Sequence, residues 1–326
     1  MVVSTYSASD SLSGHPYVSI LINNYNYGSF LDACILSALA QKYDSFEIIV
    51  VDDGSEDDSR EILKKYTDRI KTVFKENAGQ ASAFNKGFEL SKGEIICFLD
   101  ADDTFYSYKL AEVVKTFAKN PQTGWLFHEL DYVDKEGEQI TQDCSQALSR
   151  SVFIDARASM KRGNAPAESI PCGLCFKREV LAQILPMPES SGVSISDNYL
   201  KYAAIGISPG LLLNQRLAVQ RIHGENTYTF RQNNQRLRAE IHVKTGYYLQ
   251  ECFPAIGLFA DKLFVKGLAE MLVTCNFKGL FQSQEVRRHL LRNIRFDFLL
   301  LNSLKCLYHC FRLFFLKLGN PFVNSF

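Results

Sequence analysis

The chain has 326 residues, of which 46% are hydrophobic and 22% are charged, a composition typical of a folded globular protein rather than a disordered one. Lys plus Arg and Asp plus Glu number 36 each, and this balance argues against a nucleic-acid-binding surface that extends over the whole chain. Nine cysteines without the spacing of a disulfide scaffold, and an N-terminus that lacks a charged-then-apolar signal segment, predict a reducing, cytoplasmic location.

The first part of the chain alternates short apolar strands with amphipathic helices. Residues 1–15 are rich in serine and polar, and we expect a loose N-terminal tail there. Strands are predicted at residues 18–22, 46–51, 71–74 and 94–99. The helices between them have apolar stripes, such as Leu31, Ile35 and Leu39. Repeated strand–helix–strand units of this spacing predict a Rossmann-like, mostly parallel sheet flanked by helices on both faces.

Polar residues follow three of these strands at the point where each strand ends. Residues 23–26 follow the first strand, Asp52 and Asp53 follow the second, and residues 100–103 follow the fourth. In open α/β sheets ligands bind beyond the carboxyl ends of the strands. We therefore expect the three clusters to lie together and to form a binding site.

The cluster after the fourth strand contains three acids in four positions, Asp100, Asp102 and Asp103. Carboxylates this close repel one another and resist ionisation unless a cation lies among them. Oxygen ligands without thiolate favour Mg or Mn over zinc. The alternative is an ordinary turn after a strand, where Asp is common.

The pattern is less regular in the middle of the chain. Strands are predicted at 124–127 and 170–176, helices at 110–117 and 178–185 and from about 196, a hairpin turn at 134–137, and a loop with one helix within 141–169. Cys172 and Cys175 have the spacing of a redox or metal pair, but no second pair is nearby. We expect two thiols on a strand instead.

The order of six segments resembles that of family 2 glycosyltransferases with the GT-A fold. The segments are residues 18–26, 48–55, 77–87, 98–103, 196–200 and 221–226, and the resemblance extends over about residues 16–228. It implies a nucleotide-diphospho-sugar transferase domain of the GT-A fold over residues 16–230, followed by a helical C-terminal extension over 231–326.

The resemblance also implies roles for individual residues. The nucleotide sugar would contact Asn24, Tyr25, Asp52, Asp53, Asp100 and Arg221, with Asp53 at the base. Asp102 would hold a Mg or Mn ion that bridges the donor diphosphate, and His223 would reach the metal or the diphosphate. Asp197 would be the catalytic base, and Ser196 stands where the family has the Glu of its Glu-Asp motif.

Sugar transfer requires two carboxylates in different states, and the implied roles meet this need. A metal-bound carboxylate helps neutralise the leaving diphosphate, and a metal-free carboxylate takes the proton of the acceptor hydroxyl. Asp102 and Asp197 would divide these tasks, with inversion at the anomeric carbon. The alternatives are that Asp197 is a plain helix cap and that His223 is a surface or core imidazole.

The expected function is that of a metal-dependent inverting hexosyltransferase in cell-surface polysaccharide and cell wall synthesis. Its partners would be a nucleotide-diphosphate sugar and a saccharide or lipid-linked acceptor. A sugar nucleotidyltransferase should have a Gly-rich, basic phosphate loop, and an oxidoreductase should have Gly-x-Gly-x-x-Gly, but residues 23–28 have neither. A catalytically inactive carbohydrate-binding or scaffold protein of the same fold remains open.

The C-terminal segment is basic and apolar. Residues 287–317 contain seven Arg or Lys against one acid, and residues 299–318 form an apolar helical pattern with a narrow polar stripe. No apolar stretch is long enough to cross a bilayer. Such a helix could lie on an anionic membrane, on the catalytic domain or on a second copy in a homodimer. We expect peripheral association with the inner face of the cell membrane.

Overall fold

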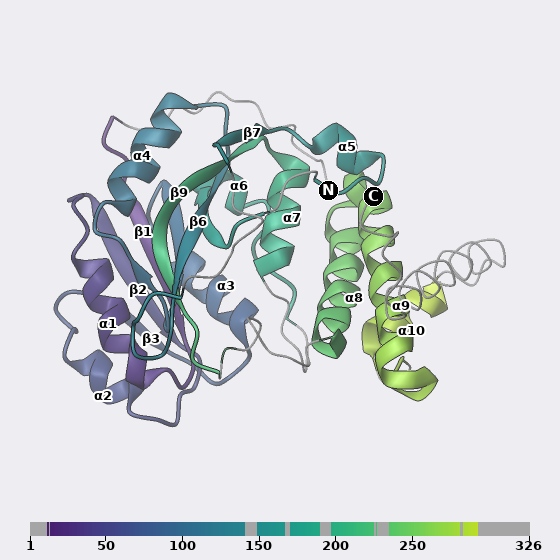
Figure 1. Cartoon of the computed structure of the whole chain (residues 1–326), viewed down its shortest axis with the longest axis horizontal. Helices are drawn as coiled ribbons and strands as arrows, with labels where there is room; N and C mark the ends of the chain where they lie inside the picture. Colours follow the sequence, from purple (N-terminus) through teal and green to yellow (C-terminus); the bar gives the residue numbers. More distant parts are fainter. Residues whose placement is uncertain are drawn as a thin grey trace. The chain divides into compact units, whose positions relative to one another are not determined.

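The computed structural model describes residues 12, 14–140, 149–166, 170–189, 197–224, 226, 235–280 and 283–292. The chain divides into two compact units (Figure 1). The first contains residues 1–158 and 166–226, and the second contains residues 159–165 and 227–326.

The described strands of the first unit form one nine-stranded sheet. They are β1 (Val18–Asn24), β2 (Phe46–Asp52), β3 (Lys71–Phe74), β4 (Ile95–Asp100), β5 (Thr104–Phe105), β6 (Trp125–Val133), β7 (Val152–Ile154), β8 (Gly173–Lys177) and β9 (Gly210–Arg221). Their order across the sheet is β3-β2-β1-β4-β8-β6-β9-β5, and β7 pairs with β9.

The sheet has a parallel half and a mixed half. β1 is parallel to β2 and β4, and β2 is parallel to β3, which confirms the prediction from the strand–helix–strand repeats. β8 is antiparallel to β4 and β6, β5 and β7 are antiparallel to β9, and β6 is parallel to β9. Of these strands, β5, β7 and β9 were not predicted. The hairpin turn at 134–137 is confirmed, because Gly137 N donates to Asp134 O at 3.1 Å.

Helices cover both faces of the parallel half. The described helices that begin in the first unit are α1 (Gly28–Leu39), α2 (Ser59–Lys64), α3 (Gln80–Leu90), α4 (Lys109–Lys119), α5 (Arg157–Lys161), α6 (Arg178–Leu181) and α7 (Asp197–Ile207). Leu31 of α1 and Leu110 of α4 are buried in one core cluster with Ile20 of β1. On the other face α3 packs Phe84 against Phe98 of β4, with ring centroids 4.5 Å apart.

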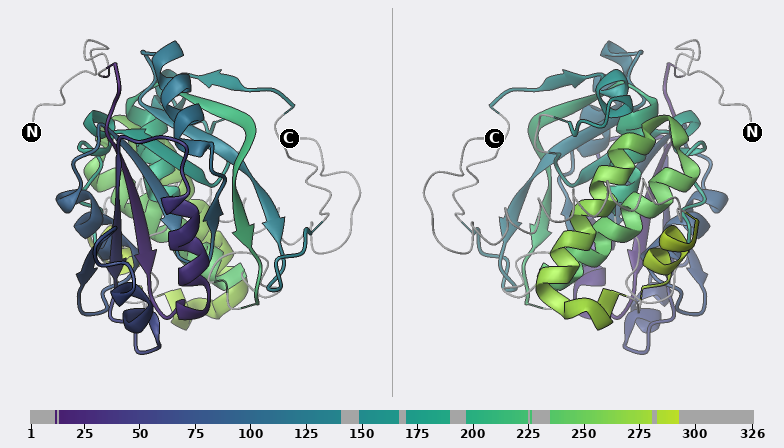
Figure 2. Two further views of the ribbon diagram at one scale, coloured as in Figure 1. Left: turned by 90° about the vertical axis from the view of Figure 1, so that its left-hand side faces the viewer. Right: turned by 90° about the vertical axis from the view of Figure 1, so that its right-hand side faces the viewer.

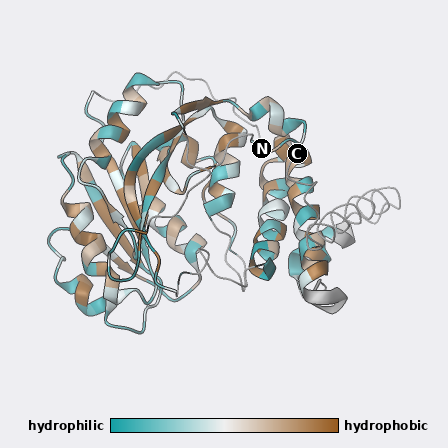
Figure 3. Ribbon diagram, viewed as in Figure 1, coloured by the Kyte–Doolittle hydropathy of each residue, from teal (hydrophilic) through white to brown (hydrophobic). Residues whose placement is uncertain are grey.

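Burial on both faces explains the continuous apolar runs in the sequence. Every residue of β4 before Asp100 is buried, and hydrophobic residues concentrate along the strands of the sheet (Figure 3). A strand can be apolar without alternation only when neither face meets water. The ends of these strands are therefore the places where polar side chains gather.

The second unit is helical in its described part. It contains α8 (Gln235–Cys252), a 3-10 turn η1 (Pro254–Ile256), α9 (Gly257–Leu280) and α10 (Gln284–Arg292). α8 and α9 lie side by side (Figure 2, right panel) around a core that includes Val243 and Phe264. A Cβ on Gly246 would lie 2.6 Å from Phe264 N, and a Cβ on Gly267 would lie 2.7 Å from Val243 N. The two helices thus approach closely because these positions are glycine.

Among the described residues, no helix combines the length and the hydrophobicity that a bilayer-crossing segment needs. Residues 299–318, for which we expect membrane association, lie outside the described residues.

Candidate active site

Buried polar side chains join the carboxyl ends of β1 and β2. Asn24 and Asp52 are register partners, and Asn24 Nδ2 donates to Asp52 Oδ1 at 2.8 Å and to Ser55 Oγ at 3.1 Å. Both side chains are buried, and Arg60 Nε lies 3.7 Å from Asp52 Oδ2. Tyr25, the next residue after Asn24, is 44% exposed. Asn24 and Asp52 therefore shape this edge of the sheet, while Tyr25 is open to a ligand.

Asp53 organises the loop that leads into α3. Its carboxylate accepts hydrogen bonds from Ala78 N at 3.1 Å and Gly79 N at 2.7 Å, and it contacts Lys75 Nζ. Gly79 has a φ of 88°, in the region that favours glycine, and α3 begins at the next residue. The Asp53 side chain thus connects the end of β2 to the start of α3.

The three acids after β4 form a single cluster. One carboxylate oxygen from each of Asp100, Asp102 and Asp103 lies within 4.8 Å of the others. Burial, followed by the charge of Asp102, raises the pKa of Asp100 to about 7, and the same two causes raise the pKa of Asp103. Three carboxylates this close together, two of them with raised pKa values, create a strong local preference for a cation.

His223 joins this cluster from the far end of the sheet. Its Nε2 lies 3.1 Å from Asp102 Oδ2, and its ring packs against Tyr27 and Phe30 at centroid distances of 5.7 and 4.6 Å. Among the described residues, its buried Nδ1 has no hydrogen-bond partner. Carboxylate oxygens with one imidazole nitrogen form a donor set that fits Mg or Mn.

Arg221 and Asn226 fix the segment that presents His223. Arg221 N donates to Asp103 Oδ1 at 3.0 Å, while its guanidinium donates to Lys135 O at 3.0 Å in the 134–137 turn. Asn226 accepts from His223 N at 2.8 Å and donates to Asp102 Oδ2 at 3.2 Å. The backbone of Arg221, rather than its side chain, therefore contacts the acid cluster.

Asp197 is the first residue of α7, and its partly exposed carboxylate forms an ion pair with the buried Lys201. Lys201 Nζ lies 2.7 Å from Asp197 Oδ2 and donates to Cys172 Sγ at 3.3 Å. The charge of Asp197 contributes, after burial and Asp102, to the raised pKa of Asp100. The two carboxylates thus lie within electrostatic range of each other, and Asp197 has a partner other than the cluster. Ser196 lies outside the described residues.

Sequence reasoning assigned no role to three residues that contact this site. They are Gln80, whose Nε2 donates to Asp100 Oδ1 at 3.3 Å, Lys201 and Asn226. The four-residue spacing of Lys201 from Asp197 on a predicted helix was a usable signal. Gln80 and Asn226 contact residues 20 and 124 positions away, and no local pattern indicates such contacts.

An α/β sheet with polar and acidic residues at its carboxyl edge has the arrangement in which open α/β sheets bind ligands. A family model described as glycosyl transferase family 2 matches residues 19–185, about half of the chain. The chain belongs to this family.

Curated relatives share part of the sequence. An uncharacterized glycosyltransferase of Nostoc sp. is 35% identical over 215 residues, which cover 65% of this chain and 66% of the relative. One from Rickettsia bellii is 37% identical over 140 residues, or 42% of this chain and 20% of the relative. The matched regions thus span less than two thirds of either relative.

Solved structures share the fold at low sequence identity. S. aureus TarS 1-349, in complex with UDP-GlcNAc, has a TM-score of 0.57 at 15% identity, covering 82% of this chain and 76% of TarS. The Pyrobaculum calidifontis mannosyltransferase PcManGT, in complex with GDP-Man and Mn²⁺, has a TM-score of 0.50 at 16% identity, covering 92% of this chain and 88% of PcManGT. The fold is the GT-A fold.

Proposed function

We propose that the protein is a metal-dependent inverting hexosyltransferase that moves a sugar from a nucleotide-diphosphate donor to an acceptor hydroxyl. The main observation in support is a division among four acids in the same part of the first unit. Asp100, Asp102 and Asp103 cluster within 4.8 Å, whereas Asp197 is paired with Lys201. This is the arrangement that donor activation and proton removal require of separate carboxylates.

The donor nucleotide would bind at the ends of β1 and β2. Asn24, Asp52 and Asp53 shape this edge, and the exposed ring of Tyr25 offers an aromatic face to a base. The Asp53 carboxylate already accepts hydrogen bonds from two N–H groups of the loop. Its role at the nucleotide base would therefore be to hold the loop and to offer one remaining lone pair. The UDP-GlcNAc in TarS and the GDP-Man in PcManGT support a nucleotide sugar as donor.

The diphosphate would lie beside the acid cluster. Asp102 and His223 would hold a Mg or Mn ion, with Asp100 and Asp103 alongside, and Arg221 would orient the segment through its backbone contact to Asp103. When bound, a divalent cation stabilises the charge that develops on the leaving diphosphate. The Mn²⁺ in PcManGT is consistent with this assignment.

Asp197 would accept the proton of the acceptor hydroxyl. The buried ammonium of Lys201 lies 2.7 Å from Asp197 Oδ2 and would orient this carboxylate for the transfer. Because the attacking hydroxyl and the diphosphate would lie on opposite sides of the anomeric carbon, direct displacement inverts the configuration.

The acceptor would be a saccharide or lipid-linked saccharide in cell-surface polysaccharide synthesis. The basic C-terminal segment would lie at the inner membrane surface. Seven basic residues against one acid in residues 287–317 support this assignment. A truncation ending at Gln282 should lose binding to anionic vesicles. If the truncated and full chains bind such vesicles equally, the membrane assignment is wrong.

Donor hydrolysis tests the proposed activity without knowledge of the acceptor. The full chain with Mn should slowly release nucleoside diphosphate from at least one of a panel of UDP- and GDP-sugars. Asp102→Asn and Asp197→Asn should lower this release at least tenfold, and Asp68→Asn, on the exposed surface after α2, should not. Equal release by all four proteins would overturn the site assignment, and no release from any donor would favour a carbohydrate-binding protein without turnover.

A further inference from the structure

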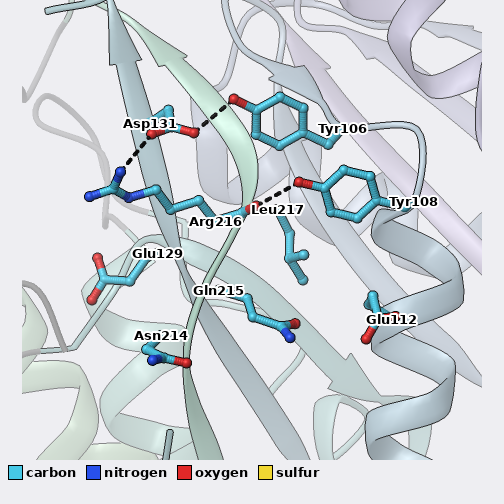
Figure 4. A pocket seen from close by; sticks show the side chains of 9 residues that line it. All are labelled: Tyr106, Tyr108, Glu112, Glu129, Asp131, Asn214, Gln215, Arg216 and Leu217. Carbon is cyan, nitrogen blue, oxygen red and sulfur yellow. Dashed lines mark hydrogen bonds and ion pairs between the residues drawn. The ribbon is translucent and has the colours of Figure 1, made fainter. Parts of the chain in front are cut away.

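A second polar pocket lies in the first unit, away from the acid cluster. Its volume is about 800 Å³, and residues of the loop after β5, of α4, of β6 and of β9 line it (Figure 4). Arg216, in the pocket, is five residues before Arg221, whose N–H contacts Asp103. Tyr106, which also lines the pocket, follows Asp103 by three residues, so at about 3.3 Å per extended residue the near side of the pocket is roughly 10 Å from the acid cluster.

An irregularity in the sheet produces this pocket. The register of the β6–β9 pair shifts on both sides of Glu129, which pairs with Arg216, whereas the preceding His128 pairs with Leu213. Asn214 and Gln215 are therefore left out of the ladder, and their amides line the pocket. Bulges of this kind commonly redirect side chains toward a binding site.

Two tyrosines form a rigid aromatic surface in the pocket. The rings of Tyr106 and Tyr108 are stacked, with centroids 5.5 Å apart and planes within 4° of parallel. Tyr106 OH donates to Asp131 Oδ2 at 2.7 Å, and Tyr108 OH donates to Arg216 O at 3.3 Å. Tyr108 is nevertheless 45% exposed. An aromatic ring held in place yet open to solvent is preorganised to stack on a ligand.

The polar groups around the tyrosines restrict the chemistry of that ligand. Glu112, Glu129 and Asp131 supply three carboxylates among the lining residues. Asp131 pairs with Arg216 of the lining at 3.1 Å and Glu112 pairs with Lys115 at 3.0 Å, so one negative charge is in surplus. A surplus of negative charge disfavours phosphates, nucleic acid and acidic glycans. Planar carboxylates and amides beside an aromatic face are suited to hydroxyl groups on a ring whose C–H face is apolar.

We infer that this pocket binds a neutral or amine-bearing saccharide, namely a part of the acceptor glycan remote from the reacting hydroxyl. Only the identification of the bound saccharide as the acceptor rests on the proposed function, because saccharide binding itself requires neither donor nor metal. A glycan bound in this pocket would remain bound to the enzyme while its reacting end lies at the acid cluster. The pocket would then select acceptors by length and charge.

Direct binding to the full chain, without donor or metal, tests the site. The probes are chitotetraose, its de-N-acetylated form, a neutral β-glucan tetramer and a sulfated oligosaccharide, measured by saturation-transfer NMR and affinity electrophoresis. We expect at least one of the three neutral or amine-bearing probes to bind and the sulfated one not to bind. Tyr108→Leu, which keeps apolar volume but removes the ring, should weaken binding at least tenfold, and Tyr108→Phe should retain it.

Two controls separate this inference from the proposed function. Phe153→Ala removes an aromatic residue of similar exposure, 47%, that does not line the pocket, and it should bind the probes as the unaltered chain does. Donor hydrolysis should be unchanged in Tyr108→Leu. If no neutral or amine-bearing probe binds, or if Tyr108→Leu binds equally well, the inference is wrong whatever the hydrolysis assay shows. If no protein hydrolyses a donor but saccharide binding still depends on Tyr108, only the transferase proposal is overturned.

Discussion

At the scale of single residues, the pairing of Asp197 with Lys201 decides how the proposed base behaves. Burial alone would lower the pKa of Lys201, but its neighbours, Asp197 foremost, outweigh this effect and the pKa is raised. The raised pKa favours the charged form of Lys201. It is a positioning residue, since it acts on the reaction through the charge and orientation of Asp197.

Replacing Lys201 by Met should shift the pH dependence of turnover. Without the cation, the Asp197 carboxylate would lie near the acid cluster without a compensating charge. The acidic limb of the pH–rate profile should move up by about one pH unit or more, whereas Lys201→Arg should keep it in place. A profile of Lys201→Met that matches the original in shape, at lower amplitude, would show that Lys201 has only a structural role.

Asn226 should affect cation affinity, because its amide contacts both Asp102 and the backbone of His223. Groups that orient metal ligands typically change affinity by 10–100-fold when removed. Asn226→Ala should therefore weaken Mn binding about tenfold, measured by the decrease of free Mn²⁺ signal in electron paramagnetic resonance. Asn120→Ala, at the end of α4, is the control. Unchanged Mn affinity in Asn226→Ala would contradict the placement of the cation beside Asp102.

The sequence predicted where the acids of the candidate site lie better than it predicted which residues contact them. The acids follow apolar strands and therefore had to lie at the sheet edge, where the structure has them. Their partners depend on where separate segments meet. Asn226 contacts Asp102 across 124 residues, and the guanidinium of Arg221 contacts the 134–137 turn instead of the acid cluster. Local sequence patterns do not determine such contacts.

At the scale of elements, the close approach of α8 and α9 depends on two glycines. A Cβ at Gly267 would lie 2.7 Å from Val243 N and 2.9 Å from Ala239 O, distances at which backbone atoms must move apart. Helix propensity alone favours Ala over Gly by about 1 kcal/mol in a helix interior. Packing and propensity therefore predict effects of opposite sign.

We expect packing to dominate, so Gly267→Ala should destabilise the second unit by about 1–3 kcal/mol, as overpacked substitutions do. The matched control is Gly257→Ala at the start of α9, where no atom lies within 4 Å of an added Cβ and the effect should be neutral or stabilising. Urea unfolding followed by circular dichroism measures both. A stabilised Gly267→Ala protein would contradict the helix contact described above.

At the scale of the whole molecule, the sheet extends well beyond the part that the sequence predicted. Strand–helix–strand repeats predicted β1 to β4, because local periodicity and the handedness of crossovers determine that half. β9 was not predicted although it has twelve residues and pairs with three other strands. Its middle residues, Asn214 to Arg216, are polar and exposed, so it lacks the apolar run of a buried strand.

A buried histidine in β6 should make the first unit sensitive to acid. His128 is fully buried, and burial, followed by the charge of Lys109, lowers its pKa below the ordinary value. Its contribution to stability is complete above pH 6.5, the pKa in the unfolded chain, and is lost as the pH falls below that value. The loss is about 1.4 kcal/mol per pH unit for one proton.

The variant His128→Asn tests this expectation, because its amide can still donate to Glu129 O as His128 Nδ1 does. The free energy of unfolding of the first unit should fall less steeply between pH 6.5 and 5 in this variant than in the unaltered chain. Comparing slopes removes the contribution of the other titrating groups, which both proteins share. It also removes the pH-independent change in the free energy of unfolding that the smaller side chain causes. Equal slopes would show that His128 is not held neutral in the fold.

The central claim is that a cation-binding carboxylate and a separate base act on one donor, and calorimetric titration of nucleoside diphosphate with and without Mn tests it most directly. The unaltered chain should bind the nucleotide more tightly with Mn. Asp102→Asn should lose this Mn-dependent gain. Asp197→Asn should keep it within about threefold while its turnover falls about 100-fold or more, the range typical of a lost general base. Loss of the gain in Asp197→Asn, or its retention in Asp102→Asn, would contradict the division of roles between the two aspartates.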